Sequence, residues 1–149
     1  MKESRLKVVV KELLKGIGFR AKKFFPYGNA GEPDIEAYRA PVLWGIEMKR
    51  GESPSAIMNP KTGWKPIQRV KALEILNAGG AYCLLATGTR RVFAWYFDPS
   101  NFRKEGGEPF GLDDLKSFVC VQYSDVNDWF IDFQIRDKVY AEKIKKGVI

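Results

Sequence analysis

The feature that most constrains this chain is an apolar segment at 42–49, VLWGIEMK, that carries two charged side chains. Side chains of a β-strand alternate between two faces. Ile46 and Met48 are therefore predicted to enter a core, while Glu47 and Lys49 share the opposite face. The segment predicts a strand that is buried on one face and carries charged groups on the other.

A turn centred on Ala40-Pro41 separates this segment from a second strand candidate, DIEAY at 34–38. Such a turn pairs residues whose numbers sum to 81, which places Asp34 opposite Glu47. Directly opposite residues share a face, with Cβ atoms about 4.5–5.5 Å apart. Two carboxylates this close repel unless a cation lies between them, and hard oxygen ligands favour Mg²⁺ or Mn²⁺. A slip of one residue would move Asp34 to the other face, and an ordinary surface strand with a cross-strand ion pair is the alternative.

The 149 residues include no histidine, which removes several mechanisms at once. A Ser-His-Asp triad, a Cys-His protease, a nuclease with an imidazole base and a His-ligated zinc are excluded. Cys83 and Cys120 lie in apolar runs without a CxxC spacing, so we expect two buried small side chains rather than a zinc site or a disulfide. Acid–base or metal chemistry must therefore use carboxylates, Lys, Tyr or water. A composition of 45% hydrophobic and 29% charged residues predicts one globular domain over 1–149.

Helical periodicity predicts two helices in the first half of the chain. Apolar residues recur at helical spacing over 3–16. A second helix is expected at 66–78, with Pro66 as its first residue. The residues expected to face inward from that helix are Ile67, Val70, Leu73 and Leu76. Between these helices, 51–65 is rich in Pro, Gly and Ser, and we expect a mobile loop that orders on nucleic acid.

The second half of the chain predicts further strands. Two buried strands are expected at 81–87 and 91–97, joined by a short turn. After residue 98 we expect a short helix near 111–117, a strand at 118–123, a further strand candidate at 129–135, and a basic helix near 137–146. This order predicts an α/β domain with a core over about 3–97 and a C-terminal extension over about 98–149.

The ordered motifs of this chain resemble the PD-(D/E)XK nuclease superfamily. Gly31-x-Pro33-Asp34 is followed after twelve residues by Glu47-x-Lys49. A helix ending at Gly-Phe precedes these motifs, and a Gln-bearing helix and a strand follow them. The likeness covers roughly residues 3–87 and is greatest to the small VRR-NUC nucleases of phages and DNA-repair proteins. It implies a restriction-endonuclease-like αβββαβ core, a central mixed sheet flanked by helices, with extra C-terminal strands and a helix.

The resemblance implies a role for each motif residue. Asp34 and Glu47 would ligate the metal, with the backbone carbonyl of Met48 as a further oxygen. Lys49 would orient or help deprotonate the attacking water and stabilise charge on the phosphate. Gln68 would hydrogen-bond a phosphate or the water, with a plain polar helix residue as the alternative.

The family often adds a carboxylate from the first helix, and this chain offers two. At 100° per residue, Glu3 lies about 50° from the centre of the apolar stripe and Glu12 about 130° away. We therefore expect Glu3 to face the sheet as an outer-sphere metal or water ligand, and Glu12 to face solvent. A helix N-terminal charge favoured by the dipole is the alternative for Glu3.

Charge is distributed unevenly along the chain. The first 25 residues carry 8 basic and 2 acidic side chains, whereas 98–137 carry 4 basic and 9 acidic ones. A net charge of +7 with this asymmetry favours a polyanionic partner. We expect Trp64 to be a candidate for stacking on an unpaired base, and packing in the core is the alternative that we favour for this residue. Lys7 and Lys11 are expected on the exposed side of the first helix. The full set of predicted phosphate-binding residues is Lys7, Lys11, Arg20, Lys22, Lys23, Arg50, Lys61, Lys65 and Arg69.

These observations predict a metal-dependent endonuclease that uses Mg²⁺ or Mn²⁺ on double-stranded or branched DNA, such as junctions and flaps. The apolar and acidic material after residue 98 is expected to form a homodimer contact. A nuclease-like module that binds nucleic acid without cutting it is the second hypothesis, and a structural or inhibitory protein is the third. A charged N-terminus and the lack of an apolar run of about 20 residues predict a cytoplasmic protein with no membrane span.

Overall fold

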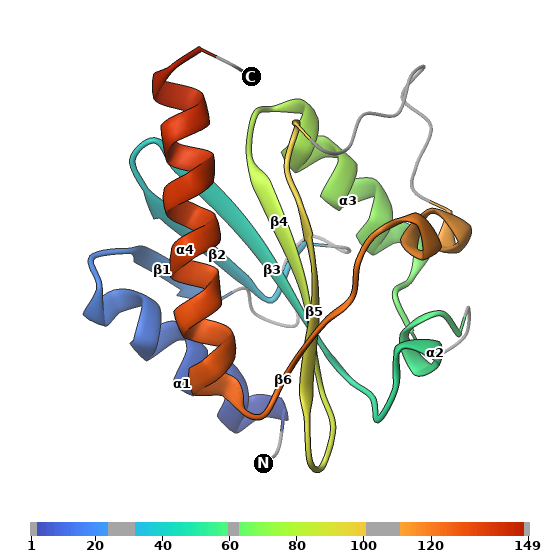
Figure 1. The fold of residues 1–149 in the computed structure, drawn as a ribbon. Coiled ribbons are helices and arrows are strands. Elements are labelled where there is room, and N and C mark those ends of the chain that lie inside the picture. Colours follow the sequence, from blue (N-terminus) through green and yellow to red (C-terminus); the bar gives the residue numbers. More distant parts are fainter. Residues whose placement is uncertain (1–2, 24–31, 60–62, 101–110, 148–149) are drawn as a thin grey trace.

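A computed structural model describes residues 3–23, 32–59, 63–100 and 111–147, which build one six-stranded mixed sheet (Figure 1). The strands lie side by side in chain order. Strands β3 and β4 are parallel, and every other neighbouring pair is antiparallel. The strands are β1 (Arg20–Lys23), β2 (Ile35–Arg39), β3 (Val42–Arg50), β4 (Ala81–Thr87), β5 (Val92–Phe97) and β6 (Val121–Tyr123).

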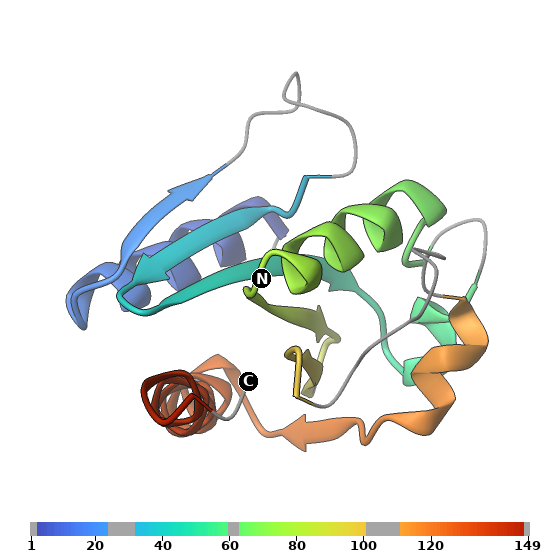
Figure 2. The same ribbon diagram turned by 90° about the horizontal axis from the view of Figure 1, so that it is seen from above.

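Helices cover both faces of the sheet, so the predicted α/β architecture is confirmed. Helices α1 and α4 pack on one face, and α3 covers the other, together with α2 and the 3-10 helix η2 (Figures 1 and 2). Among the helices described, none has the length and apolar character needed to cross a membrane. Their bounds are α1 (Glu3–Gly16), α2 (Pro54–Ile57), α3 (Pro66–Asn77), η2 (Leu112–Ser117) and α4 (Val126–Lys145).

The amphipathic pattern of α1 produces the expected packing. Leu6, Val10 and Leu14 repeat every four residues and are at most 2% exposed. Their shared stripe lies against the sheet, as helical spacing requires. Gly18 follows the helix with a φ of 93°, a conformation that glycine adopts at little cost. The chain then reverses into edge strand β1, which the sequence pattern did not predict.

The register of β2 and β3 is the predicted one. Ile35 lies opposite Ile46, and Arg39 lies opposite Val42 across the turn. Even-numbered residues of β3 face the core under α1 and α4. Odd-numbered residues therefore face the side covered by α3.

The C-terminal region contradicts one prediction, because 129–135 is helix rather than strand. The carboxylate of Asp125 accepts a hydrogen bond of 2.9 Å from the Asp128 N–H and caps α4 at its start. Trp129 and Phe133 lie four residues apart and are both fully buried. The helix carries apolar residues on a buried face and on an exposed face, so its sequence contains the nearly continuous apolar run that is also typical of a strand.

Expectations on the α3 side are confirmed only in part. Leu73 and Leu76 are buried, as predicted, whereas Ile67 is 48% and Val70 38% exposed, because the buried stripe of α3 runs through Ala72 instead. The segment 51–65, expected to be a loop, forms the short helix α2 in its described part, and its mobility stays a prediction. It is anchored through Ile57, which is 1% exposed.

Candidate metal-dependent hydrolytic site

The structure brings Asp34 and Glu47 together at the end of the β2–β3 ladder. Asp34 directly precedes β2, and Glu47 lies on β3 where the continued register sets it opposite. The two carboxyl groups are hydrogen-bonded to each other. The Met48 N–H also donates to Asp34 Oδ2 over 2.7 Å, which fixes the Asp34 carboxylate against β3.

Glu47 is the unusual member of this acidic pair, Asp34 and Glu47. Glu47 is only 3% exposed, and its Oε2 atom is buried with no hydrogen-bond partner among the described residues. Burial raises the pKa of the Glu47 carboxyl well above its ordinary value, and the neighbouring Asp34 raises it further. Lys49 and Lys7 oppose this shift only in part. Burial and the neighbouring Asp34 therefore favour the protonated form of Glu47 more than they would favour it in an exposed carboxyl group.

Asp34 stays ionised because several groups donate to it. Burial alone would raise its pKa, but hydrogen bonds from Glu47, Lys7 and the Met48 N–H together lower the pKa below its ordinary value. The Lys7 ammonium lies 2.8 Å from Asp34 Oδ1, and both side chains are mostly buried. A permanent cation thus already lies beside the acidic pair.

Lys49 and the Met48 backbone complete the site. Lys49 shares the face of Glu47, since both are odd-numbered residues of β3, and its charge lowers the pKa of that carboxyl. The N–H and C=O of one strand residue point toward the same edge. Because the Met48 N–H points to Asp34, the Met48 carbonyl is directed toward the same side as the acidic pair.

The acidic pair has the chemistry of a hard-cation site. Oε2 of Glu47 is a buried oxygen without a partner, and a buried carboxylate is satisfied best by a cation. In the part of the chain that the structure describes, no third carboxylate, Cys or His joins the pair in a metal-binding cluster. The remaining ligands would be the Met48 carbonyl, water and substrate oxygens, which suits Mg²⁺ or Mn²⁺, ions that bind few protein ligands.

Close packing between α3 and the sheet positions the segment that leads to Asp34. A Cβ atom on Gly45 would lie 2.7 Å from Ile75 Cδ1 and 3.3 Å from Pro33 Cγ. Because Gly45 has no side chain, α3 can approach the sheet closely and Pro33 can pack against Gly45. Pro33 directly precedes Asp34 in the chain. Lys71 of the same helix lies 3.7 Å from Glu32, which ties α3 to this approach segment.

Gln68 lies one turn before Lys71 on α3. Its Oε1 accepts a 2.9 Å hydrogen bond from the Lys65 N–H and caps the start of the helix. Since α3 runs antiparallel to β3, this turn lies toward the end of β3 that carries Glu47 and Lys49. Contact of Gln68 with substrate stays a prediction.

The structure contradicts two predicted nucleic-acid contacts. Trp64 is 0% exposed and stacks on Tyr82 and Phe97, with ring centroids 5.7 and 5.8 Å away, so it cannot stack on a base. Lys7 does not lie on the exposed side of α1. At 100° per residue it lies about 90° from the apolar centre, and its long stem reaches round the sheet end to Asp34.

The other predicted contacts differ in accessibility. Arg20, Lys22, Arg50 and Lys65 are exposed, whereas Lys11 and Arg69 are half-buried. Arg69 donates to the Trp64 carbonyl over 2.6 Å. Glu12 is 66% exposed, as predicted. The predictions for Lys61 and for the side chains of Glu3 and Lys23 fall outside the described residues.

The helical position of Lys7 could have indicated its contact with Asp34. Position 7 lies on the flank of the α1 stripe rather than opposite it, where a long side chain can reach a neighbouring strand end. The burial of Trp64 agrees with the alternative of core packing, which the sequence analysis favoured for this residue.

Comparisons with known proteins give little further guidance. No protein-family model matches the chain, and no curated protein matches it. Among solved structures, the chain is similar to a 1.6 Å structure of Archaeoglobus fulgidus Hjc, a Holliday junction resolvase from an archaeal hyperthermophile. The match has a TM-score of 0.42 and 15% identity, and covers 77% of this chain and 91% of that one. A likeness this distant supports no conclusion about function, which rests instead on the geometry of the acidic pair.

Proposed function

We propose that this protein is a divalent-metal-dependent endonuclease that hydrolyses DNA phosphodiester bonds. The observation that carries the proposal is Glu47, a buried carboxylate with an unpartnered oxygen, hydrogen-bonded to Asp34. A protein rarely retains such a group without use, because leaving it unpaired costs about 1–3 kcal/mol or more. Structural stability alone gives no reason for it, whereas a cation site does.

Asp34, Glu47 and the Met48 carbonyl are the residues that would hold Mg²⁺ or Mn²⁺. Such an ion lowers the pKa of a coordinated water and neutralises charge on a phosphate. A bound cation would favour the ionised form of Glu47 and so oppose the rise of its pKa that burial and Asp34 cause. Both carboxylates would then be ionised and turned toward the substrate side of β3.

Lys49 and Lys7 supply fixed positive charge around the same point. Lys49, beside Glu47, can hydrogen-bond a water and orient it toward a phosphate, or neutralise the charge that develops there. Lys7 holds Asp34 ionised, which keeps one carboxylate ready to bind a cation at any pH above its lowered pKa. Lys7 is therefore a positioning residue for Asp34.

DNA as substrate, and branched DNA in particular, is proposed from the family resemblance of the motifs. The exposed basic residues Arg20 and Lys22 support a polyanionic ligand. They lie on the same face as the acidic pair, because they pair with Tyr38 and Glu36 of β2. Contacts of this kind bind the backbone and do not read sequence.

The test is cleavage of linear, flapped and four-way DNA with Mg²⁺, Mn²⁺ or EDTA. We expect cleavage with either metal and none with EDTA. Asp34→Ala, Glu47→Ala and Lys49→Ala should each reduce cleavage to near background, since raising the activation barrier by several kcal/mol slows the reaction by orders of magnitude. Glu12→Ala, which removes an exposed carboxylate, is the control. Wild-type rates in any of the three site variants would refute the assignment.

A nuclease-like binding module is the competing function. It predicts DNA binding that is insensitive to EDTA, with no cleavage in either metal. Mg²⁺-dependent protection of the folded protein from urea would favour the endonuclease, because a pure binder needs no divalent ion.

We also propose that the protein forms a homodimer through the outer face of α4. Ile131, Ile135 and Val139 repeat every four residues on this face and are 51–59% exposed. Residues 125–135 include three acidic side chains and no basic one, while 136–145 include four basic and two acidic. An antiparallel pair of α4 helices therefore sets the acidic half of one against the basic half of the other. Sedimentation should show a dimer that Ile135→Asp converts to a monomer, and a monomeric wild type would refute the proposal.

A further inference from the structure

A cavity of about 590 Å³ lies at the same end of the sheet as the acidic pair, between α1, α4 and the tip of the β4–β5 hairpin. Arg50 at the end of β3 faces it, because even-numbered residues of β3 face the α1 side. It therefore opens on the face of the sheet opposite Glu47 and Lys49. Its polar and charged lining includes Arg50, Thr87, Arg90, Arg91, Ser124 and Asp125.

The charge of this cavity is strongly positive. Its lining includes three arginines against a single carboxylate, Asp125. That carboxylate already accepts a hydrogen bond from the Asp128 N–H in capping α4. Arg50, Arg90 and Arg91 are exposed, and within the described residues none forms an ion pair with a carboxylate. The pKa of the nearby Glu52 carboxyl is lowered chiefly by the hydrogen bonds that it accepts from Thr89, and Arg50 and Arg91 are close enough to lower it further. The guanidinium groups therefore keep donors with which they can bind a phosphate in bidentate fashion.

The hairpin tip that carries Arg90 and Arg91 is held rigidly to the segment after β3. Both the N–H and the hydroxyl of Thr89 donate to the Glu52 carboxylate, over 2.9 and 2.7 Å. A Cβ atom on Gly88 would lie 2.6 Å from Glu52 Oε2 and 3.0 Å from the Gly51 carbonyl, so glycine permits this close approach. The backbone of the hairpin tip is thus positioned relative to the end of β3 before any ligand binds.

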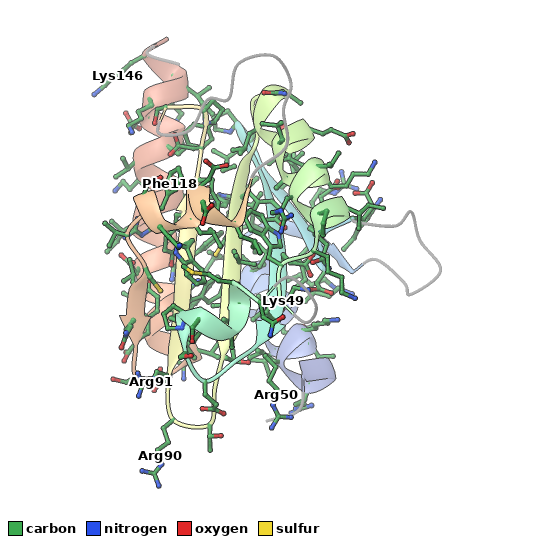
Figure 3. The ribbon with its side chains drawn as sticks, turned by 90° about the vertical axis from the view of Figure 1, so that its right-hand side faces the viewer. Lys49, Arg50, Arg90, Arg91, Phe118 and Lys146 are labelled. Atoms are coloured by element: carbon green, nitrogen blue, oxygen red, sulfur yellow. The ribbon has the colours of Figure 1, made fainter. Side chains whose placement is uncertain are left out.

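The position of Arg50 on β3 links this cavity to the candidate site. Arg50 directly follows Lys49, and the two side chains point to opposite faces at the end of one strand. A strand of nucleic acid that crosses this end of the sheet would meet the acidic pair on one face and the three arginines on the other. Figure 3 shows Arg90 and Arg91 at this end of the molecule, far from Lys146.

We infer that the arginine cavity, defined by Arg50, Arg90 and Arg91, binds the phosphate backbone of the nucleic-acid substrate beside the scissile position. This inference rests on the proposed function in that the ligand is the same nucleic acid. It extends that function by adding Arg90 and Arg91, which the sequence analysis did not single out, to the predicted phosphate-binding residue Arg50.

The experiment measures binding of a short fluorescein-labelled DNA duplex by fluorescence anisotropy in EDTA, so that cleavage does not interfere. The variant Arg90→Ala/Arg91→Ala should raise Kd by at least about tenfold. It should also reduce the slope of log Kd against log salt by about 0.9 for each phosphate that the variant no longer neutralises. The matched control Lys116→Ala/Lys146→Ala removes two exposed charges outside the cavity and should change Kd by less than about twofold.

The outcomes separate this inference from the proposed function. If the wild type cleaves DNA but Arg90→Ala/Arg91→Ala binds and cleaves like it, the cavity has no such role and the nuclease proposal stands. If the wild type binds DNA without cutting it in Mg²⁺ or Mn²⁺, the nuclease proposal fails, while a weakened double variant still supports the cavity. Equal weakening by the control pair would reduce the effect to general charge and overturn the inference.

Discussion

Replacing Glu47 by Gln should make the metal-free protein more stable while abolishing cleavage. Glutamine has the shape of a protonated glutamate, and its amide N–H can donate to Asp34 as the Glu47 carboxyl does. It cannot ionise, however, so it never carries a charge into the buried position where Oε2 has no partner. Stability and activity should therefore change in opposite directions at this position.

The size of the effect follows from the burial of Glu47. An ionised carboxylate that is 3% exposed and incompletely hydrogen-bonded costs about 1–3 kcal/mol. Because the pKa of Glu47 is raised in the folded protein, the native state binds more protons than the unfolded state between the two pKa values. The free energy of unfolding of the wild type must then fall as pH rises through this window, by up to about 1.4 kcal/mol per pH unit. Glu47→Gln does not show this decline.

Urea denaturation in EDTA at a series of pH values measures the difference directly. The stability advantage of Glu47→Gln should be smallest in acid, grow as pH rises above the unfolded pKa, and level off above the raised folded pKa at about 1–3 kcal/mol. Glu12→Gln removes an exposed charge and should stay within about 0.5 kcal/mol of wild type throughout. Saturating Mg²⁺ should stabilise the wild type, by about 2.7 kcal/mol at a hundredfold excess over Kd, and leave Glu47→Gln unchanged.

One result would refute this reasoning. If Glu47→Gln is less stable than wild type at alkaline pH in EDTA, or if the difference does not vary with pH, Glu47 is not a strained buried carboxylate. The case for a cation site would then lose its main support.

Substitutions at three other positions test the surroundings of the site. Lys7→Met should lower the free energy of unfolding by about 1 kcal/mol at neutral pH. Because the pKa of Asp34 is depressed, its contribution is present above the unfolded pKa, so this deficit should vanish on acid titration as pH falls through the folded value. Trp64→Ala should cost about 3–5 kcal/mol in thermal or urea unfolding, while Trp64→Phe should bind DNA like wild type; weakened binding by a stable Trp64→Phe would contradict its core role. Gly63→Ala would place a Cβ 2.0 Å from the Ile57 carbonyl oxygen, so thermal unfolding should show a large loss of stability, and a wild-type Tm would contradict this contact.

Several parts of the fold could be predicted because their causes are local. The four-residue repeat of Leu6, Val10 and Leu14 predicts both α1 and its buried face, since period alone sets which side chains share a stripe. The turn at Ala40-Pro41 sets the register of β2 and β3, so the sum of residue numbers predicts which residues lie opposite each other.

Other features were decided only by contacts between distant parts of the chain. The segment 129–135 could serve as strand or helix by its apolar content, and the Asp125 cap with burial of Trp129 selects helix. Trp64 enters the core because Tyr82 and Phe97 offer an aromatic surface contributed by two other strands.

The sequence by itself determined which acidic side chains share a face, because two adjacent strands joined by a tight turn leave little freedom in register. Tertiary structure alone decided that Lys7 reaches Asp34, that Glu47 is buried with an unpartnered oxygen, and that Arg50, Arg90 and Arg91 line one cavity. Each of these depends on how helices and hairpins pack in three dimensions, and a packing distance has no fixed spacing along the chain.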